Sequence, residues 1–351
     1  DVCSSDLTIY HAIDSETANP FQAYQATRYI DTAIPHIPVT AHGLKENGYA
    51  TIATTNWLPY SWSVNNIAFA EVMHTALSYF QAGRAEAGYK LLKSSVLDGM
   101  YLGDSPGNFG QISFYDAARG ECYRDFGDPI GVASRVLIQG LFGILPDALN
   151  QQIILRPGFP DDWDKASVST PDISYRFTRK EDTDTYHITQ RFQTPLHPVL
   201  QINARKEKIR SVKVNGVPAT WQSIESAHGY PLLSIQAEGT SSTTITIEWE
   251  GASLHTLAVQ KLVIASNGKL ALQIPSGASI SQVYDPQSVL AKHTVEATAF
   301  NAQLKGEPGH HTFFVYTHQG EMDWWQPVNI YIENTRKAPS YTDFADIRDR
   351  K

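Results

Sequence analysis

The first part of the chain carries hydrophobic residues at a helical spacing. Asn65–Ala82 and Arg84–Leu97 each place apolar side chains about every 3.6 residues, and Phe21–Ala33 predicts another helix. A very short turn separates the first two segments, so they are expected to form an antiparallel helical hairpin. A further helix is predicted from Asp128, which is expected to be its N-cap, with Pro129 at the first helical position.

From Gln151 onward, the period of the hydrophobic pattern changes to two, which is typical of half-buried strands. Five alternating segments follow one another: ISYRFTRK, TYHITQRFQ, HPVLQINAR, IRSVKVNG and TTITIEWEG. Turn residues separate them, including those of Asp182–Asp184, so Ile173–Gly251 is expected to form an antiparallel sandwich. A second set of alternating segments begins after a predicted boundary near Ala252–Leu254.

These changes of pattern predict a multidomain protein with α and β parts. A helical domain is expected over residues 8–150 and a β-sandwich domain over 151–252. A second, small β domain is expected over 253–334, and residues 335–351 are expected to be a linker or tail.

Charge, cysteine count and missing motifs exclude several classes of protein. The formal net charge is −8 and no basic stripe is present, so no nucleic-acid partner is expected. Two cysteines, Cys3 and Cys122, make neither a disulfide framework nor a thiol metal site. No apolar run is long enough to span a bilayer, so no membrane insertion is expected. No nucleotide-binding or zinc-binding motif occurs, and neither a cofactor nor a metal is expected.

Both ends of the chain look foreign to a natural protein. DVCSSDL and IRDRK resemble translated sequencing-adaptor sequence of the kind found on metagenomic reading frames. Asp1–Leu7 and Ile347–Lys351 are therefore expected to lie outside the fold, with ordinary disordered termini as the alternative. The adaptor interpretation predicts that the chain is a fragment of a larger protein.

The most informative stretch is the long segment Ser105–Asp128, a predicted loop between helices. It combines carboxylates with arginines and aromatic rings: Tyr115, Asp116, Arg119, Glu121, Tyr123, Arg124, Asp125 and Phe126. Long ordered connections are usually functional, and this composition suits an uncharged polyhydroxylated ligand. Glu121, Asp116 and Asp125 are the candidate catalytic carboxylates, with Arg124 as a candidate binding residue. The alternative is that Glu121 only forms an ion pair with a neighbouring arginine.

A second set of candidate residues precedes the helix predicted from Asn65. The candidate sugar platforms and hydroxyl partners are Trp57, Tyr60, Trp62, Asn65 and Asn66. The alternative is that at least one of these tryptophans fills the core, because large aromatic side chains are mostly buried. Glu71, on the following helix, is a further candidate.

Three runs follow one another in a recognisable order: ATTNWLPYSWSVNNIAFAEVMHTALSYFQAGRAEAGYKLL, SPGN…RGECYRDFGDPIG, and SRVLIQGLFGILPD…ILRPGFPDDW. Together they resemble the C-terminal half of a six-hairpin (α/α)6 glycosidase-like domain. The nearest resemblance is to large glycoside-hydrolase-like proteins of gut Bacteroidetes, and the more distant one is to α-L-rhamnosidase-type enzymes. In such proteins the last barrel helix ends in a Gly-Ile-x-Pro segment, here Gly143–Pro146. A strand with a Pro-x-x-Pro-x-x-Trp pattern follows, here Pro157–Trp163, and the resemblance covers roughly Phe21–Gly251.

The resemblance implies a fold and a location. The expected fold is a partial (α/α)6 helical barrel followed by antiparallel β-sandwich units. The first half of the barrel would belong to the rest of the parent polypeptide, which would be periplasmic or exposed at the cell surface. An exposed apolar edge is then expected where that half would pack, near Met73, Leu77, Leu91 and Leu137.

The resemblance also implies an activity. The chain is expected to be a fragment of a glycoside hydrolase that acts on a plant or host polysaccharide or oligosaccharide, with inversion at the anomeric carbon. Related enzymes carry a general-base glutamate at the place of the long loop, which corresponds to Glu121 or Asp116. Because one catalytic carboxylate of such families lies in the earlier half, this fragment could be inactive alone. The alternative is a non-catalytic carbohydrate-binding or structural protein with a glycosidase-like fold.

Overall fold

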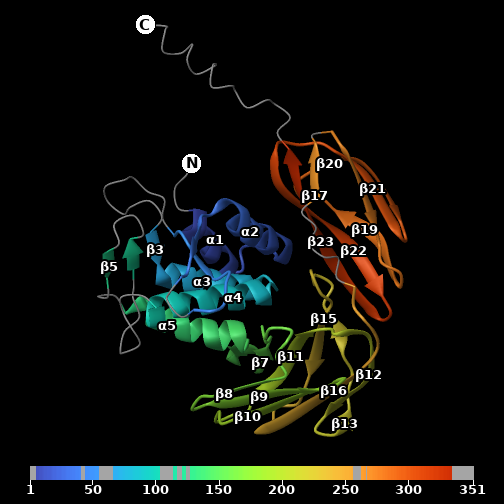
Figure 1. The fold of residues 1–351 in the computed structure, drawn as a ribbon. Coiled ribbons are helices and arrows are strands. Elements are labelled where there is room, and N and C mark those ends of the chain that lie inside the picture. The colour runs from blue at the N-terminus through green and yellow to red at the C-terminus, as the bar shows by residue number, and fades with distance from the viewer. Residues whose placement is uncertain are drawn as a thin grey trace. The chain divides into compact units, whose positions relative to one another are not determined.

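The computed structural model describes residues 5–40, 44–54, 66–102, 114–116, 121–123, 127–255, 262–265 and 267–333. The chain divides into two compact units, Asp1–Ser253 and Leu254–Lys351. The first unit contains the described α-helices followed by β-sheets, and the described part of the second unit is built from strands (Figure 1). The division lies at the place where the hydrophobic pattern begins its second set of alternating segments.

The described residues of the first unit contain five α-helices. They are α1 (Ser5–Asp14), α2 (Pro20–Ala33), α3 (Phe69–Gln81), α4 (Ala85–Val96) and α5 (Asp128–Arg135). π-helical turns continue two of them, Leu97–Leu102 after α4 and Val136–Leu141 after α5. α3 contacts each of the other four helices, and Figure 1 shows it alongside α4. None of the described helices is long and apolar enough to cross a membrane.

The predicted fold class, with its partial (α/α)6 helical barrel, is wrong. The described residues are mostly strands in several sheets, and no ring of paired helices is present among them. The helices instead pack around α3, whose apolar face forms the centre of a cluster with residues of α2, α4 and the second π-helical turn. The amphipathic period that predicted barrel helices is shared by the helices of any layered or bundled arrangement. This period therefore could not show whether the helices form a closed barrel or pack around one central helix.

Two helix starts differ from the sequence predictions. α3 begins at Phe69 rather than Asn65, because residues 66–68 form a strand. α1 begins at Ser5, so part of the N-terminal segment that was expected to lie outside the fold is helical. The predicted helix Phe21–Ala33 is confirmed as α2, where Asn19 and Gln22 form a reciprocal capping box.

The predicted apolar edge is largely absent. Met73, Leu77 and Leu91 have exposed fractions of 0%, 1% and 6%, because they pack into the cluster around α3. Leu137 is exposed by 43%, and Ile130, two turns earlier, by 56%. Of the four residues predicted to form the apolar edge, only Leu137 is therefore exposed.

Two larger sheets follow the helices in the first unit. The six-stranded sheet has the order β13 (Val217–Pro218), β12 (Lys206–Val214), β16 (Ser242–Ser253), β10 (Thr183–Gln190), β9 (Ile173–Lys180) and β8 (Lys165–Ser169). The five-stranded sheet has the order β14 (Gln222–Ser223), β15 (Leu232–Gln236), β11 (His197–Asn203), β7 (Gln152–Leu155) and β6 (Ile144–Asp147). Pairing is antiparallel except between β7 and β11, which are parallel. Alternate residues of β9, β10 and β16 are buried, as the period of two predicts.

One charged side chain is buried inside the six-stranded sheet. Asp184, in β10, has an exposed fraction of 1%. Its Oδ1 accepts hydrogen bonds from Nε of Arg179 at 3.0 Å and from Nη1 of Arg205 at 2.9 Å. Its Oδ2 accepts a hydrogen bond from the indole nitrogen of Trp249 at 3.1 Å. The carboxylate is therefore compensated by two cations and one neutral donor, which is the condition for burying a charge.

Phe80, in the last turn of α3, is enclosed by three glycines. Gly88 lies on α4, Gly140 in the second π-helical turn, and Gly158 after β7. A side-chain carbon added at Gly88 would lie 3.0 Å from Cδ2 of Phe80, one at Gly140 would lie 2.6 Å from it, and one at Gly158 would overlap the ring. We call Gly88, Gly140 and Gly158 the glycine collar. It lets three segments approach one ring and so joins the helices to the start of the five-stranded sheet.

Replacing Gly143 by alanine is expected to destabilise the first unit by about 2 kcal/mol or more. Gly143 has a φ of +64°, which disfavours any side chain, and an added carbon would overlap the carbonyl group of Arg156. That approach is fixed because Arg156 N donates to Gly143 O at 2.9 Å. Urea unfolding measures the effect. Gly131→Ala, in α5 with nothing within 4 Å of the added carbon, is the control and should be neutral or stabilising.

The described residues of the second unit form two sheets over one apolar core. Its four-stranded sheet has the order β17 (Leu262–Ala265), β23 (Met322–Glu333), β22 (Gly309–Gln319) and β19 (Ala278–Tyr284). Its three-stranded sheet has the order β18 (Lys269–Gln273), β21 (Ala299–Leu304) and β20 (Leu290–Glu296). Phe300 and Phe313, from the two sheets, are both fully buried with ring centroids 5.3 Å apart. The core therefore lies between these sheets.

Candidate functional site

A small three-stranded sheet lies at the start of α3. Its strands are β3 (Asn66–Ala68), β4 (Phe114–Asp116) and β5 (Glu121–Tyr123). Both pairs are antiparallel, and the register places Asn66 opposite Asp116 and Asp116 opposite Glu121. The long predicted loop therefore contains two strands that the sequence did not indicate. Three of the predicted site residues occupy one row of this sheet.

The first strand of this sheet is held against the helical core. Ile67, at its centre, is fully buried in the cluster around α3. Ala68 N donates a hydrogen bond of 2.9 Å to Oγ1 of Thr54, which is itself buried. Because β3 runs directly into Phe69, the sheet is fixed at the N-terminal end of α3.

Glu71 lies in the first turn of α3, directly after this sheet, and is half-buried. Burial raises the pKa of its carboxyl group above the ordinary value, and the negative charge of Asp128 raises the pKa further. A backbone hydrogen bond acts in the opposite direction, and a helix start also favours the ionised form. Burial prevails over both. A raised pKa is the direction that a general acid needs.

Asp128 has a different position from the one predicted. It is the first residue of α5, and the N-cap is Gly127, which makes no side-chain capping bond. The prediction of Asp128 as N-cap is therefore wrong. Its exposed carboxylate is close enough to raise the pKa values of both Glu71 and His74. Since α5 packs against α3, the two helix starts bring these carboxyl groups into one electrostatic neighbourhood.

His74 follows Glu71 by one helical turn and stacks on Tyr10 of α1, with ring centroids 4.8 Å apart. Burial lowers the pKa of His74, and the positive charge of Arg135 lowers it further, whereas Asp14 and Asp128 raise it. The net direction is downward, so the imidazole is neutral at pH 7. His74 is therefore a hydrogen-bonding group beside the carboxyl groups rather than a second cation.

Asp14 forms a structural ion pair at the other end of α3 and α5. Its two oxygens accept hydrogen bonds from Nη1 and Nη2 of Arg135 at 2.8 and 2.6 Å, and Gln81 Nε2 donates to Oδ1 at 3.0 Å. Burial raises the pKa of Asp14, but the hydrogen bonds from Arg135 and Gln81 lower it more, and the net direction is downward. This carboxylate links α1, α3 and α5, and it is poorly suited to donate a proton.

Asp98 is a second half-buried carboxyl group near the start of α3. It lies in the π-helical turn that continues α4, and burial raises its pKa. Because α3 and α4 form an antiparallel hairpin with a turn of residues 82–84, the end of α4 lies near the start of α3. Glu71 and Asp98 are thus two carboxyl groups with raised pKa values at one end of the hairpin.

The structure describes the backbone of only part of the predicted site. Asn66, Asp116 and Glu121 lie in the three-stranded sheet. The other predicted residues lie outside the described part of the chain: Trp57, Tyr60, Trp62, Asn65, Arg124 and Asp125. The prediction that Glu121 and Asp116 share a cavity with the aromatic run therefore stays a prediction.

Sequence reasoning gave Glu71 little weight and missed Asp98. The one available signal was a carboxylate in the first turn of an otherwise apolar helix, at Glu71. The raised pKa of Glu71 depends on its burial in the folded chain and on the charge of Asp128 in α5, and no local sequence pattern reports either. Among the described residues, no group of three or more His, Cys, Asp or Glu side chains is arranged to hold a metal ion.

Comparisons with known proteins give little guidance. No protein-family model and no curated protein matches the sequence. Among solved structures, an α-L-rhamnosidase from Dictyoglumus thermophilum is similar at 11% identity with a TM-score of 0.34, over 52% of this chain and 21% of its own. Tandem Ig repeats of Dlar match 43% of this chain and 90% of their own at 9% identity and a TM-score of 0.17. The N-terminal periplasmic domain of ScsB from Proteus mirabilis matches 49% of this chain and 99% of its own at 8% identity and a TM-score of 0.13. These TM-scores are too low to support an argument about fold or function.

Proposed function

We propose that the protein is a glycoside hydrolase whose chemistry takes place at the N-terminal end of α3. The observation that carries the proposal is the half-buried carboxyl group of Glu71, whose pKa is raised, directly beside the sheet in which Asp116 and Glu121 are paired in register. Hydrolysis of a glycosidic bond needs one protonated and one ionised carboxyl group. Perturbed carboxyl groups gathered in one place are a common mark of such a site.

In the proposed reaction, Glu71 donates its proton to the glycosidic oxygen as the bond breaks. Glu121 or Asp116 acts as the ionised partner that activates water, and Asn66 is a hydroxyl partner for the sugar. The neutral imidazole of His74 offers a further hydrogen bond. The substrate is a plant or host polysaccharide or oligosaccharide. Inversion at the anomeric carbon would correspond to carboxyl groups about 6.5–9.5 Å apart, and the anomer first formed, observed by NMR, tests it.

The proposal is tested by incubating the purified chain with a panel of plant and host glycans and measuring the release of reducing sugar. Glu121→Gln and Asp116→Asn keep the side-chain size and remove the titratable group. We expect one of them to lower turnover by about a hundredfold or more, the effect of losing a general base. The other is expected to change mainly KM, as a hydroxyl partner would.

Two results separate this function from the non-catalytic alternative. Sugar binding by calorimetry without hydrolysis of any glycan would favour a carbohydrate-binding protein. Hydrolysis that is unchanged in both variants would place the chemistry elsewhere. The variants should retain the wild-type melting temperature within a few degrees, so that lost activity reports on chemistry rather than on unfolding.

A further inference from the structure

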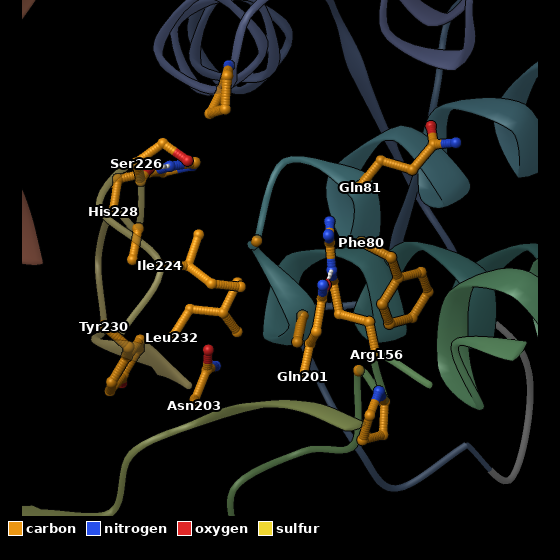
Figure 2. Close-up of a pocket in the computed structure, with 16 residues that line it drawn as sticks. Phe80, Gln81, Arg156, Gln201, Asn203, Ile224, Ser226, His228, Tyr230 and Leu232 are labelled. Carbon is orange, nitrogen blue, oxygen red and sulfur yellow. Dashed lines mark hydrogen bonds between the residues drawn. The ribbon is translucent and has the colours of Figure 1, made fainter. Parts of the chain in front are cut away.

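The first unit contains a cavity away from the start of α3, between the other end of the helical hairpin and the five-stranded sheet. Its volume is about 130 Å³. It lies among residues of the α3–α4 turn, the segment after β7, β11, and the segment that joins β14 to β15 (Figure 2). The cavity is not fully enclosed, so a single sugar ring can enter it with part of its surface still in solvent.

Arg156 is the cation of this cavity. Its Nε donates a hydrogen bond of 2.7 Å to Oε1 of Gln201, which fixes the direction of the side chain. Among the described residues, its Nη1 and Nη2 have no hydrogen-bond or ion-pair partner, and Glu16 acts on it only at longer range. The two groups that normally grip a carboxylate are thus available.

The described cavity wall carries a positive charge and no negative one. No aspartate or glutamate is among the described residues that line it, although the whole chain has a formal net charge of −8. Arg156 itself is an exposed residue, and its guanidinium is charged at neutral pH. A positive charge in the wall of a cavity, without a matching carboxylate, favours an anionic ligand.

The rest of the wall has two kinds of surface. Apolar contact is offered by Phe80, Ile224, Leu232 and the ring of Tyr230, and amide groups by Gln201 and Asn203 (Figure 2). Apolar walls with a few convergent polar groups are typical of small-molecule sites. Amides bond hydroxyl groups, while the apolar side accommodates a carbon skeleton. The wall therefore suits a polyhydroxylated organic ligand.

His228 keeps the two sides of the cavity together. Its Nε2 lies 2.8 Å from the carbonyl oxygen of Ala82, so this nitrogen carries the proton and donates. Burial lowers the pKa of His228, which keeps the ring neutral. The same ring packs edge-on against Tyr24, with centroids 5.5 Å apart. The cavity is thus formed before any ligand arrives.

We propose that this cavity binds a small sugar acid, with its carboxylate on Nη1 and Nη2 of Arg156 and a hydroxyl group on Asn203. The site is separate from the carboxyl groups at the start of α3. The proposal does not depend on whether the protein hydrolyses glycans, and binding alone tests it.

The probe is sodium glucuronate, titrated by calorimetry into the full chain, with glucose as the uncharged matched ligand. Glucuronate should bind at least about tenfold more tightly than glucose, the scale of a charge-assisted hydrogen bond. Arg156→Gln should remove that preference, and Arg210→Gln, the same change at an arginine exposed by 63%, should preserve it. Equal binding of both sugars, or no glucuronate binding by the wild type, would overturn the proposal.

A second variant covers the case in which Arg156→Gln unfolds. Ser226→Trp places a large side chain at an exposed position of the cavity wall without changing the charge. It should abolish glucuronate binding while the melting temperature stays near that of the wild type. Unchanged glucuronate binding in a folded Ser226→Trp protein would place the ligand elsewhere and end the proposal.

Discussion

Glu71→Gln should lower turnover on a cleaved glycan by a factor of about 10² to 10⁴, the effect of losing a general acid. Glutamine keeps the size and the hydrogen-bonding capacity of the side chain but cannot supply a proton. The loss should be greatest for substrates with a poor leaving group, because these depend most on protonation of the glycosidic oxygen. Initial rates on a natural glycan and on an activated aryl glycoside measure the difference.

The same substitution should stabilise the protein at neutral pH. Burial raises the pKa of Glu71 in the folded state, so the folded protein holds this proton more tightly than the unfolded chain. Its contribution to stability is therefore present below the unfolded pKa and is lost as the pH rises through the folded pKa. Glu71→Gln should raise the melting temperature at pH 7, and this gain should shrink towards pH 4. A structural role for Glu71 would give the opposite sign.

Glu238→Gln is the matched control for this pair of measurements. The Glu238 side chain is exposed by 93% and lies on the sheet region of the first unit. Glu238→Gln should leave turnover unchanged and give no pH-dependent gain in melting temperature. If Glu71→Gln and Glu238→Gln behave alike in both measurements, Glu71 is not the acid.

Asp184→Ala is expected to destabilise the first unit by about 2–3 kcal/mol, because it leaves the buried indole N–H of Trp249 without an acceptor and two partly exposed arginines without their counter-charge. Arg179, Arg205 and the indole of Trp249 all donate to this one carboxylate. Asp184→Asn should also be costly, since the amide keeps the shape but not the charge. Urea unfolding followed by tryptophan fluorescence measures both, because Trp249 is a direct partner.

Asp182→Asn provides the comparison two residues away. Asp182 pairs with Lys206 at 2.7 Å, but its side chain is exposed by 55%. Solvent screens such a pair, so Asp182→Asn should lower the free energy of unfolding far less than Asp184→Ala does. Similar losses at residues 182 and 184 would mean that burial of the Asp184 network does not govern its strength.

The sequence identified elements with a long hydrophobic period and failed on short ones. α3, α4, β9 and β10 were predicted because each repeats its pattern over eight or more residues. β3, β4 and β5 were not, because three residues carry too little of a period of two. The sequence also indicated a turn at Asp182–Asp184, whereas Asp184 lies within β10. Aspartate is usually found in turns, but here the strand position is stabilised by hydrogen bonds to the carboxylate. One donor, Arg205, is far enough along the chain that no local pattern indicates it.

The candidate site, like the fold, was predicted only in part from the sequence. Glu121 and Asp116 were selected for their composition, and their backbones are paired in one sheet, although their chemical roles stay predictions. The raised pKa values of Glu71 and Asp98 could not be predicted, because burial arises from helices that meet only in the folded chain. The α-helical signals themselves did not specify how the helices are arranged, which is why the barrel prediction was wrong.

The glycine collar around Phe80 has a consequence for how this protein can change over evolutionary time. Since three separate segments touch the same ring, the volume at residue 80 and the volumes at residues 88, 140 and 158 are not independent. A larger residue at Gly158 becomes acceptable only in a background where residue 80 has already become smaller. Substitutions at these four positions should therefore accumulate in a restricted order, and they should co-vary among related chains even though the residues are far apart in sequence.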